Sequence, residues 1–277
     1  MEYTLVVSDM DGTLLRDDKT ISPRTLTAIH RFQEAGGRFT IATGRNVGGV
    51  EPHVQAMGLT TPILLLNGCL GYDRSTDTDV FCHVMERPAL DAVWPHLVAN
   101  NLNIIVHGRR RGLTRVHNEV IAEHLRHDGI SFDYIPDLSP ATAGEAVKVL
   151  TIGEPWQLDR AEEAIEQADI PVVLVRSHPL YLEVLPQGGG KGTGLHSLTE
   201  HLCIPHSKTL TLGDWLNDLD LLAAAGLSVA MANGHPTLKK AAHRWTASNM
   251  DDGVAQVLEA LVEGRPVGEP NGMTSEK

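Results

Sequence analysis

Apolar runs and helical patterns alternate along the first 66 residues of the chain. Tyr3 to Ser8 is a short run rich in β-branched residues, which is typical of a strand buried on both faces of a parallel sheet. A helical pattern then begins at Ser22-Pro23, where Ser is a good N-cap and Pro suits the first helical position, and it ends at Gly36-Gly37. A strand, a helix and a strand follow, at residues 38–42, up to about 57, and 62–66. This alternation predicts an α/β fold with a doubly wound parallel sheet.

The middle of the chain has shorter and more closely spaced strand patterns. We expect strands near residues 76–85, 103–106, 147–152, 172–176 and 182–185, and helices near 88–100 and 158–167. Strands this close together favour antiparallel pairing, so this stretch predicts a separate α+β module. The α/β alternation returns at Lys191, with helices near 194–201, 218–225 and 254–262 and strands near 209–212 and 228–231.

These patterns divide the chain into a core and an insert. The predicted core is discontinuous and comprises residues 1–81 and 188–263, with a Rossmann-like sheet. The insert comprises residues 82–187. Residues 264–277 are rich in Gly, Pro, Ser and Glu and offer little to bury, so we expect a flexible C-terminal tail.

The composition excludes several classes of protein. The 277 residues include 23 Lys and Arg and 35 Asp and Glu, for a formal charge of −12, which argues against a general nucleic-acid binder or an anionic membrane surface as partner. Three scattered cysteines, Cys69, Cys82 and Cys203, are too few for a disulfide framework. The N-terminus does not resemble a signal peptide, and the apolar runs are far shorter than the ~20 residues of a membrane span. We therefore expect a cytoplasmic protein, and the sequence does not indicate its oligomeric state.

Polar residues gather where four predicted strands end. These strand ends carry Asp9 and Asp11; Thr43-Gly44-Arg45; Asn67-Gly68; and Asp214, Asn217 and Asp218. Ligands of open parallel sheets bind outside the carboxyl ends of the strands, so we expect these side chains to converge. Several carboxylates in one place repel one another, and a divalent cation relieves the repulsion. Hard oxygen ligands suit Mg²⁺.

Four motifs in order resemble those of the haloacid dehalogenase superfamily. They are Asp9-Met10-Asp11-Gly12-Thr13, Thr43-Gly44-Arg45, Lys191 within Gly189-Gly190-Lys191-Gly192, and Gly213-Asp214-Trp215-Leu216-Asn217-Asp218. The late stretches Val229-Ala230-Met231 and Asp252-Gly253-Val254 are similar to the Cof-type subgroup, which carries a cap domain between the second and third motifs. The predicted insert lies at that place. The resemblance extends to about Val262.

The resemblance implies a mechanism and a role for each residue. Asp9 would be the nucleophile that forms an aspartyl-phosphate, and Asp11 the general acid and base. Mg²⁺ would be held by the Asp9 carboxylate, the Asp11 carbonyl and Asp214, with Asp218 beside it. Lys191 would neutralise the phosphoryl oxygens. The other expected phosphate contacts are the Thr43 hydroxyl, the backbone N–H groups of Met10 and Gly44, the Asn217 amide, and Arg45 at the rim of the pocket.

The sequence departs from the family pattern at two places. Trp215 replaces a small or polar residue, and Ala232-Asn233-Gly234 replaces the usual Gly-Asn-Ala. Neither change removes an expected metal ligand or the nucleophile, so Trp215 puts the substrate in doubt and leaves the chemistry intact.

Other interpretations of single motifs are weaker. Gly188-Gly189-Gly190-Lys191 fails the P-loop template because position 185 is Leu and position 192 is Gly. His124 and His127 have no second ligand pair nearby, so we expect solvated histidines and no zinc site. We expect Arg109-Arg110-Arg111 to be a solvated hairpin tip, with a contact to an anionic substrate as the alternative. His107, His178 and Tyr181 are further candidates for lining a cap.

The leading hypothesis is a Mg²⁺-dependent phosphatase of small phosphorylated metabolites, such as sugar phosphates or phosphorylated cofactors. A phosphomutase on the same scaffold and a non-catalytic phosphate-binding regulatory protein are the alternatives. The sequence does not identify the substrate, because specificity would depend on cap residues that form no motif.

Overall fold

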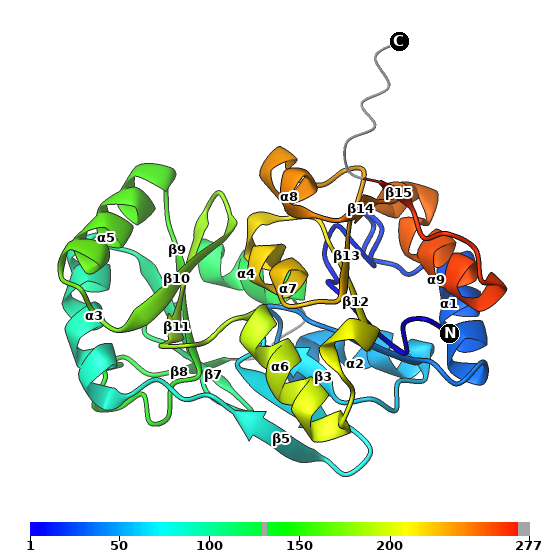
Figure 1. The fold of residues 1–277 in the computed structure, drawn as a ribbon. Coiled ribbons are helices and arrows are strands. Elements are labelled where there is room, and N and C mark those ends of the chain that lie inside the picture. The colour runs from blue at the N-terminus through cyan, green and yellow to red at the C-terminus, as the bar shows by residue number, and fades with distance from the viewer. Residues whose placement is uncertain (129–131, 271–277) are drawn as a thin grey trace.

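The fold contains two six-stranded sheets and one three-stranded sheet (Figure 1). The computed structural model describes residues 1–128 and 132–270. In the first sheet the strand order is β15-β14-β13-β12-β1-β2, and all neighbours are parallel except β15 and β14. Its strands are β1 (Leu5–Ser8), β2 (Arg38–Ile41), β12 (Thr209–Gly213), β13 (Leu227–Ala230), β14 (Arg244–Trp245) and β15 (Glu269–Pro270).

Helices cover both faces of this first sheet. On one face are α1 (Pro23–Glu34), α2 (Val47–Met57) and α9 (Gly253–Glu263); on the other are α6 (Lys191–Leu202) and α7 (Leu219–Ala223), with α8 (Pro236–Ala241) beside α7. The alternation of side chains along β1 matches the two layers, because Val6 packs with α1 and α9 while Leu5 and Val7 pack with α6 and α7. The predicted doubly wound α/β fold is therefore confirmed.

A three-stranded antiparallel sheet extends the edge of the first sheet. Its strands are β3 (Ile63–Leu65), β4 (Leu70–Asp73) and β5 (Thr78–Cys82). A single parallel bridge between Ala42 and Leu64 joins it to the chain that follows β2. The carboxyl end of β3 consequently lies next to the carboxyl end of β2.

The second six-stranded sheet lies in the predicted insert. The order is β10-β11-β9-β6-β7-β8, antiparallel except for the parallel pair β7 and β8. Its strands are β6 (Asn103–His107), β7 (Gly112–Thr114), β8 (Phe132–Tyr134), β9 (Lys148–Ile152), β10 (Val172–His178) and β11 (Tyr181–Pro186). Helices α3 (Arg87–Ala99) and α5 (Pro155–Gln167) bury one face, and Ile121 of α4 (Glu119–Asp128) packs with Ile105 and Leu150 on the other.

Several elements differ in extent from the sequence-based expectation. Helix α5 begins at Pro155, about one turn early, because the Gln157 side chain accepts a hydrogen bond from the Glu154 N–H at 2.9 Å and Pro occupies the first position. At the C-terminus Val267 is buried, and Glu269–Pro270 pair with β14, so part of the segment predicted as a tail is attached to the first sheet. Residues 271–277 lie outside the described part of the chain.

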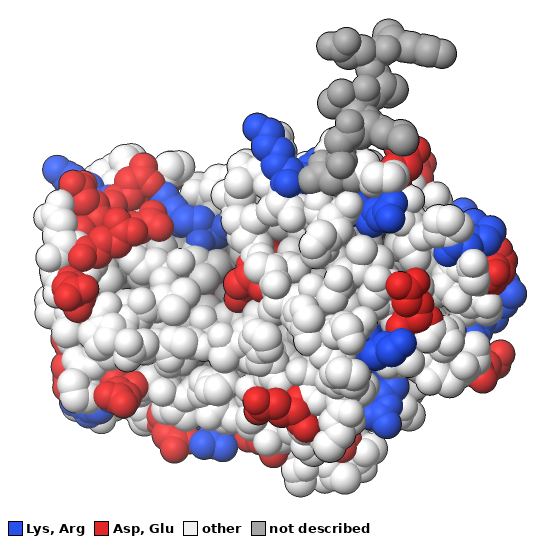
Figure 2. All heavy atoms as spheres, in the orientation of Figure 1, with Lys and Arg blue, Asp and Glu red and all other residues white. Residues whose placement is uncertain are grey.

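The surface charge is uneven on the face in Figure 2. Acidic side chains gather over α5, which contributes Asp159, Glu162, Glu163 and Glu166. Within the described residues, no helix has the length and apolar character needed to cross a bilayer.

Candidate active site

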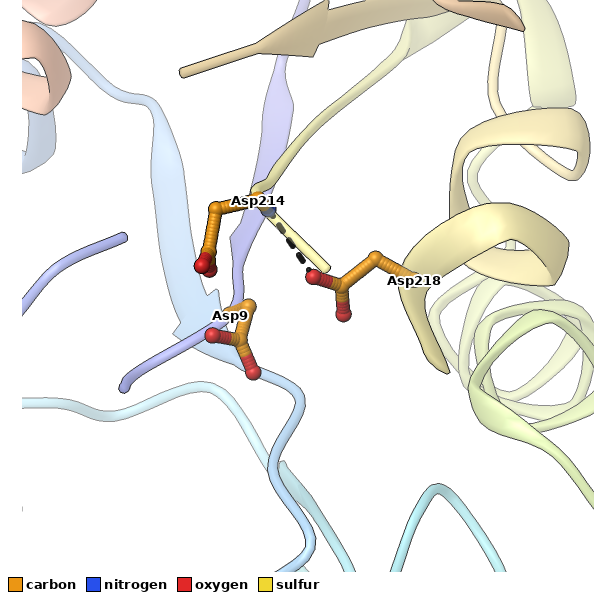
Figure 3. Close-up of side chains that lie close together, drawn as sticks. All are labelled: Asp9, Asp214 and Asp218. Atoms are coloured by element: carbon orange, nitrogen blue, oxygen red, sulfur yellow. Dashed lines mark hydrogen bonds between the residues drawn. The ribbon is translucent and has the colours of Figure 1, made fainter. Parts of the chain in front are cut away.

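Three buried carboxylates meet at the carboxyl ends of β1 and β12. Asp9 follows β1, Asp214 follows β12, and Asp218 ends the short 3-10 turn Leu216–Asp218 (Figure 3). One oxygen from each carboxylate lies within 4.8 Å of the others. Since β1 lies between β2 and β12, the three residues sit where the strand order of the doubly wound sheet reverses, which is the usual ligand position in this architecture.

Hydrogen bonds fix the two carboxylates that follow β12. The Thr13 hydroxyl donates to Asp214 Oδ1 at 2.7 Å. Asp218 Oδ2 accepts from the N–H groups of Asp214 and Trp215 at 3.0 and 3.2 Å. Gly12 is required beside them, because its φ is +83° and a Cβ there would lie 2.4 Å from Asp214 Oδ2.

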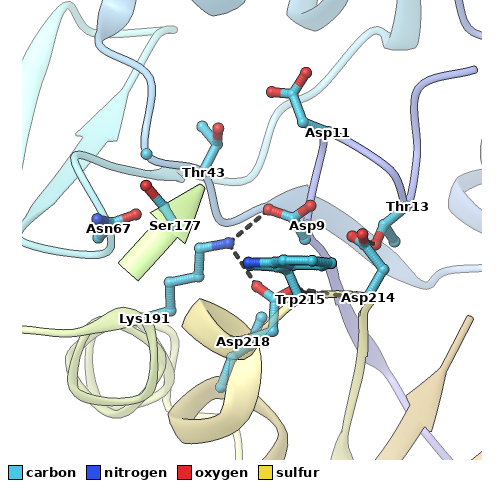
Figure 4. Close-up of polar contacts among 12 residues, drawn as sticks. Asp9, Asp11, Thr13, Thr43, Asn67, Ser177, Lys191, Asp214, Trp215 and Asp218 are labelled. Carbon is cyan, nitrogen blue, oxygen red and sulfur yellow. Dashed lines mark hydrogen bonds and ion pairs between the residues drawn. The ribbon is translucent and has the colours of Figure 1, made fainter. Parts of the chain in front are cut away.

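Lys191 joins two members of the acidic group. Its side chain is fully buried, and Nζ donates to Asp9 Oδ1 at 2.5 Å and to Asp218 Oδ1 at 2.6 Å (Figure 4). Lys191 is the first residue of α6, and Asp220 Oδ2 caps this helix by accepting from the Gly192 N–H at 2.9 Å. A Cβ on Gly190 or Gly192 would lie 2.3 or 2.5 Å from oxygens of Asp220, which explains the glycines on both sides of the lysine.

The charges of this group are out of balance. Burial, and next the Asp218 charge, raise the pKa of Asp9 well above its ordinary value despite Lys191. The same two causes raise the pKa of Asp214 to about 7. Burial lowers the pKa of Lys191, but Asp218 and Asp9 outweigh it and hold that pKa above its ordinary value. Three carboxylates against one ammonium leave an excess of negative charge among hard oxygen donors, so the donor set fits a divalent cation such as Mg²⁺.

Asp11 lies apart from the acidic group, as Figure 4 shows. Its carboxylate accepts two hydrogen bonds from Arg45 at 2.8 Å each and one from Lys19 at 2.8 Å. Burial raises the pKa of Asp11, but the bonds and charges of Arg45 and Lys19 outweigh it and lower this pKa well below its usual range. Arg45 is buried and also donates to the Gly49 carbonyl at 3.1 Å, so it does not lie at the rim of the pocket, where we expected it.

The remaining predicted phosphate contacts come from three parts of the chain. Thr43 is buried, and its hydroxyl oxygen accepts from the Arg45 N–H at 3.2 Å. Met10 is fully buried directly after Asp9. Asn217 lines a cavity of about 640 Å³ together with Lys191 and Asn67, between the first sheet and β10.

Three charged or polar residues near the site had no assigned role in the sequence-based prediction. The sequence places Asn67 at a strand end but gives it no role, and it gives no reason to single out Lys148 or Glu183, which lie on β9 and β11 of the second sheet. The structure places Lys148 Nζ 2.7 Å from both Glu183 Oε2 and the Gly44 carbonyl oxygen. The sequence does contain one indication of this pair, since each of two apolar strands includes one charged residue. A charged side chain is seldom fully buried unless it is paired.

One expectation about a histidine was wrong, and one about three arginines was right in part. His124, which we expected to be solvated, is buried on α4, where its ring stacks on Phe132 of β8, and the side chain of His127 lies outside the described residues. His107, a candidate for lining the cap, is buried on β6. Among the described residues no histidine belongs to a group of three possible metal ligands. At the expected solvated hairpin tip Arg110 and Arg111 are exposed, but Arg109 and Arg110 also form ion pairs with Asp79 of β5 at 3.4 and 3.1 Å, so the tip contacts the three-stranded sheet.

The two departures from the family pattern lie beside the acidic group (Figure 4). The Trp215 ring packs edge-on against His235, with ring centroids 5.2 Å apart. The Asn233 side chain donates to the Gly12 carbonyl at 2.8 Å and accepts from the Asn249 N–H at 3.1 Å. Asn233 therefore braces the loop that carries Gly12.

Fold and site together define a haloacid dehalogenase-like hydrolase. The model of this family matches residues 6–258, so the chain belongs to it, and the predicted family and enzyme class, a hydrolase of phosphoric monoesters, are confirmed.

Individual relatives are similar along nearly their whole length. The 5-amino-6-(5-phospho-D-ribitylamino)uracil phosphatase YitU of Bacillus subtilis is 31% identical over 92% of this chain and 96% of its own. The pyridoxal phosphate phosphatase YbhA of Escherichia coli is 28% identical over 93% of this chain and 98% of its own. A haloacid dehalogenase-like hydrolase from Bacteroides thetaiotaomicron has a crystal structure with a TM-score of 0.81 and 27% identity, covering 94% of this chain and 99% of its own.

Proposed function

We propose that this protein is a Mg²⁺-dependent phosphatase that hydrolyses small phosphate monoesters through an aspartyl-phosphate on Asp9. One observation carries the proposal. A buried carboxylate at the topological switch point contacts a buried ammonium, and one of its oxygens lies within 4.8 Å of an oxygen from each of two further carboxylates. This combination suits phosphoryl transfer, which depends on positioning and charge neutralisation.

In the proposed reaction an Asp9 oxygen forms a bond to phosphorus while the bond to the leaving oxygen breaks. Water then attacks the acyl phosphate, and phosphate leaves with the Asp9 carboxylate restored. When bound to Asp9, the Asp11 carbonyl, Asp214 and Asp218, Mg²⁺ would neutralise charge on the phosphoryl oxygens. Lys191 adds a fixed positive charge, and the Thr43 hydroxyl, the N–H groups of Met10 and Gly44, and Asn217 complete the proposed phosphate contacts. Arg45 would join them only once Asp11 releases its guanidinium.

Asp11 is the proposed general acid and base, and its surroundings set a condition on this role. While Arg45 and Lys19 hold it, its lowered pKa keeps it ionised but makes it a weak base, so these ion pairs have to loosen before Asp11 can take a proton from water. To protonate the leaving oxygen, Asp11 must first leave these ion pairs and take up a proton.

We propose residues 82–187 as a cap that selects the leaving group and excludes water. Sugar phosphates and phosphorylated cofactors are the proposed substrates. The named relatives support this class, because one acts on a phosphorylated ribityl compound and another on pyridoxal phosphate.

The test is release of p-nitrophenol from p-nitrophenyl phosphate with and without Mg²⁺. Wild-type protein is expected to be active only with the metal, and Asp9→Asn should abolish turnover. Asp169→Asn is the matched control, because Asp169 is exposed and Asn tolerates its left-handed φ of 50°. Unchanged turnover in Asp9→Asn would refute the nucleophile. A panel of sugar phosphates then separates hydrolysis, which yields free phosphate, from mutase activity, which yields an isomer, and from simple binding, which yields neither.

A further inference from the structure

The second sheet carries a buried ion pair on the side that faces the active site. Lys148 lies on β9 and Glu183 on the neighbouring strand β11, and Nζ and Oε2 are 2.7 Å apart. Only 3% and 5% of the two side chains is exposed. The Ser177 hydroxyl donates to the other Glu183 oxygen, so both oxygens of this carboxylate are bound.

Both members of the pair also bind loops, one that follows a strand of the first sheet and one that follows a strand of the three-stranded sheet. The Lys148 ammonium donates to the Gly44 carbonyl at 2.7 Å, and the Asn67 amide donates to Glu183 Oε2 at 2.5 Å. Gly44 follows β2 and Asn67 follows β3, and the Asn67 N–H donates to the Thr43 carbonyl at 2.9 Å. The two loops therefore form one unit that the second sheet holds from outside.

The packing around Gly44 leaves little freedom. An ideal Cβ on Gly44 would lie 3.0 Å from Asn67 Oδ1 and 3.6 Å from Lys148 Nζ. The Gly44 carbonyl orients the peptide that ends at the Arg45 nitrogen, and this N–H in turn donates to the Thr43 hydroxyl oxygen at 3.2 Å. A shift of Lys148 would be transmitted directly to Thr43 and Gly44, two of the proposed phosphate contacts.

Stability alone is a weak reason for this arrangement. Buried ion pairs are often no more stabilising than apolar side chains of the same volume, since desolvation offsets the attraction. An apolar pair on β9 and β11 would also fill the space, but it would offer no hydrogen bonds to Gly44 and Asn67. The hydrogen bonds to Gly44 and Asn67 therefore explain the two charges better than a contribution to stability does.

We propose that Lys148, held by Glu183, is a positioning residue that fixes the Thr43-Gly44 turn and Asn67 in the geometry that binds a phosphoryl group. The inference rests on the proposed function and adds the second sheet as a structural part of the phosphate site. Because Lys148 acts through the backbone of Gly44, its effect should be the same for every leaving group.

The test uses the full-length double variant Lys148→Met/Glu183→Gln, which removes both charges and leaves no uncompensated buried ion. Binding of inorganic phosphate is measured by titration calorimetry with Mg²⁺, and kcat/KM is measured for p-nitrophenyl phosphate and pyridoxal 5′-phosphate. We expect phosphate to bind about 10- to 100-fold more weakly, with kcat/KM lowered by a similar factor for both esters, because a misplacement of about 1 Å can cost that much. Lys208→Met, at an exposed position, is the control and should match wild type.

Several outcomes would overturn the inference. One is wild-type phosphate affinity in a double variant that is folded by circular dichroism, because this leaves Lys148 a structural role only. Another is a loss of kcat/KM that differs more than about tenfold between the two esters, since Lys148 would then contact the leaving group. If the double variant does not fold, Glu183→Gln takes its place with the same expected direction, and unchanged phosphate affinity there also refutes the inference.

The phosphate titration separates this inference from the proposed function. Weaker phosphate binding in the variant, in a protein that releases no phosphate from any ester, would refute the phosphatase and retain the positioning role. A wild-type protein that hydrolyses the esters, together with variants that bind phosphate as tightly as wild type, would retain the phosphatase and refute the positioning role.

Discussion

Replacing Lys191 by Met tests the charge balance of the site most directly. The substitution keeps a long side chain in the buried space at the start of α6 but removes the ammonium. Asp9 and Asp218 then each lose a charged partner that lies 2.5 and 2.6 Å away. Without a cation, the two carboxylates have to take up a proton or remain buried and unpaired.

The expected cost follows from this geometry. Removing one partner of a buried ion pair destabilises a protein by about 3–5 kcal/mol. For a chain of this size each kcal/mol corresponds to about 2–4 °C in Tm, so the metal-free variant should melt about 10 °C below wild type. Mg²⁺ should stabilise the variant more than wild type, because the metal then meets two carboxylates that lack any other cation. Phosphate release should fall by at least about 100-fold in either condition, because the fixed charge on the phosphoryl oxygens is missing.

The assay is differential scanning fluorimetry in EDTA and across a Mg²⁺ series, together with phosphate release. Lys208→Met serves as the control for the chemical change at an exposed site and should remain within about 0.5 kcal/mol of wild type. A metal-free Lys191→Met that melts within about 2 °C of wild type would refute the stabilising role of the ion pairs. Equal Mg²⁺ stabilisation of both proteins would refute the shared cation site.

Three further outcomes follow from the same site. Gly12→Ala should lower stability by about 1–3 kcal/mol and weaken Mg²⁺ binding, because the new Cβ would clash with Asp214. Gly36→Ala is the control: its φ of +87° is similar, but no atom lies within 4 Å of the new Cβ, so thermal melts and Mg²⁺ titrations should show the backbone penalty alone. Because the pKa of Asp214 is raised to about 7, Mg²⁺ must displace a proton from this carboxyl at lower pH. The Mg²⁺ affinity should therefore fall by up to about tenfold per pH unit below 7. Calorimetry at pH 6, 7 and 8 that finds the same Mg²⁺ affinity would contradict this. Inorganic phosphate should bind only after Mg²⁺, because the metal-free site is acidic, and binding in EDTA as tight as in Mg²⁺ would exclude that order.

The convergence of the strand ends could be predicted from the sequence because it depends on one local rule. A buried strand in a parallel sheet ends at the same edge as its neighbours, so Asp9, Thr43 and Asp214 had to lie near one another. The start of α1 is equally local, since the Ser22 side chain accepts from the Thr25 N–H at 3.0 Å and Pro23 follows it.

The surroundings of Asp11 and Lys148 could not be predicted in the same way. Asp11 is 34 residues from Arg45, and Lys148 is 104 residues from Gly44, so both contacts depend on how loops and sheets pack. Periodicity shows which face of a strand is buried but not what covers it. The short strands β7 and β8, with three residues each, offer too few positions for any period to show.

The effect of the formal charge of −12 depends on where the acidic residues lie. Part of it belongs to α5, where most Asp and Glu side chains are exposed to solvent and screened by salt. Asp9, Asp214 and Asp218 are buried, and their charge acts at short range on anything that enters the site. A phosphate ester therefore meets repulsion that Lys191, a bound cation or protonation of these carboxylates has to offset. Because that balance is set within a few ångströms, an acidic protein can bind an acidic substrate, and in the proposed reaction we expect the metal to be a condition for binding as well as for chemistry.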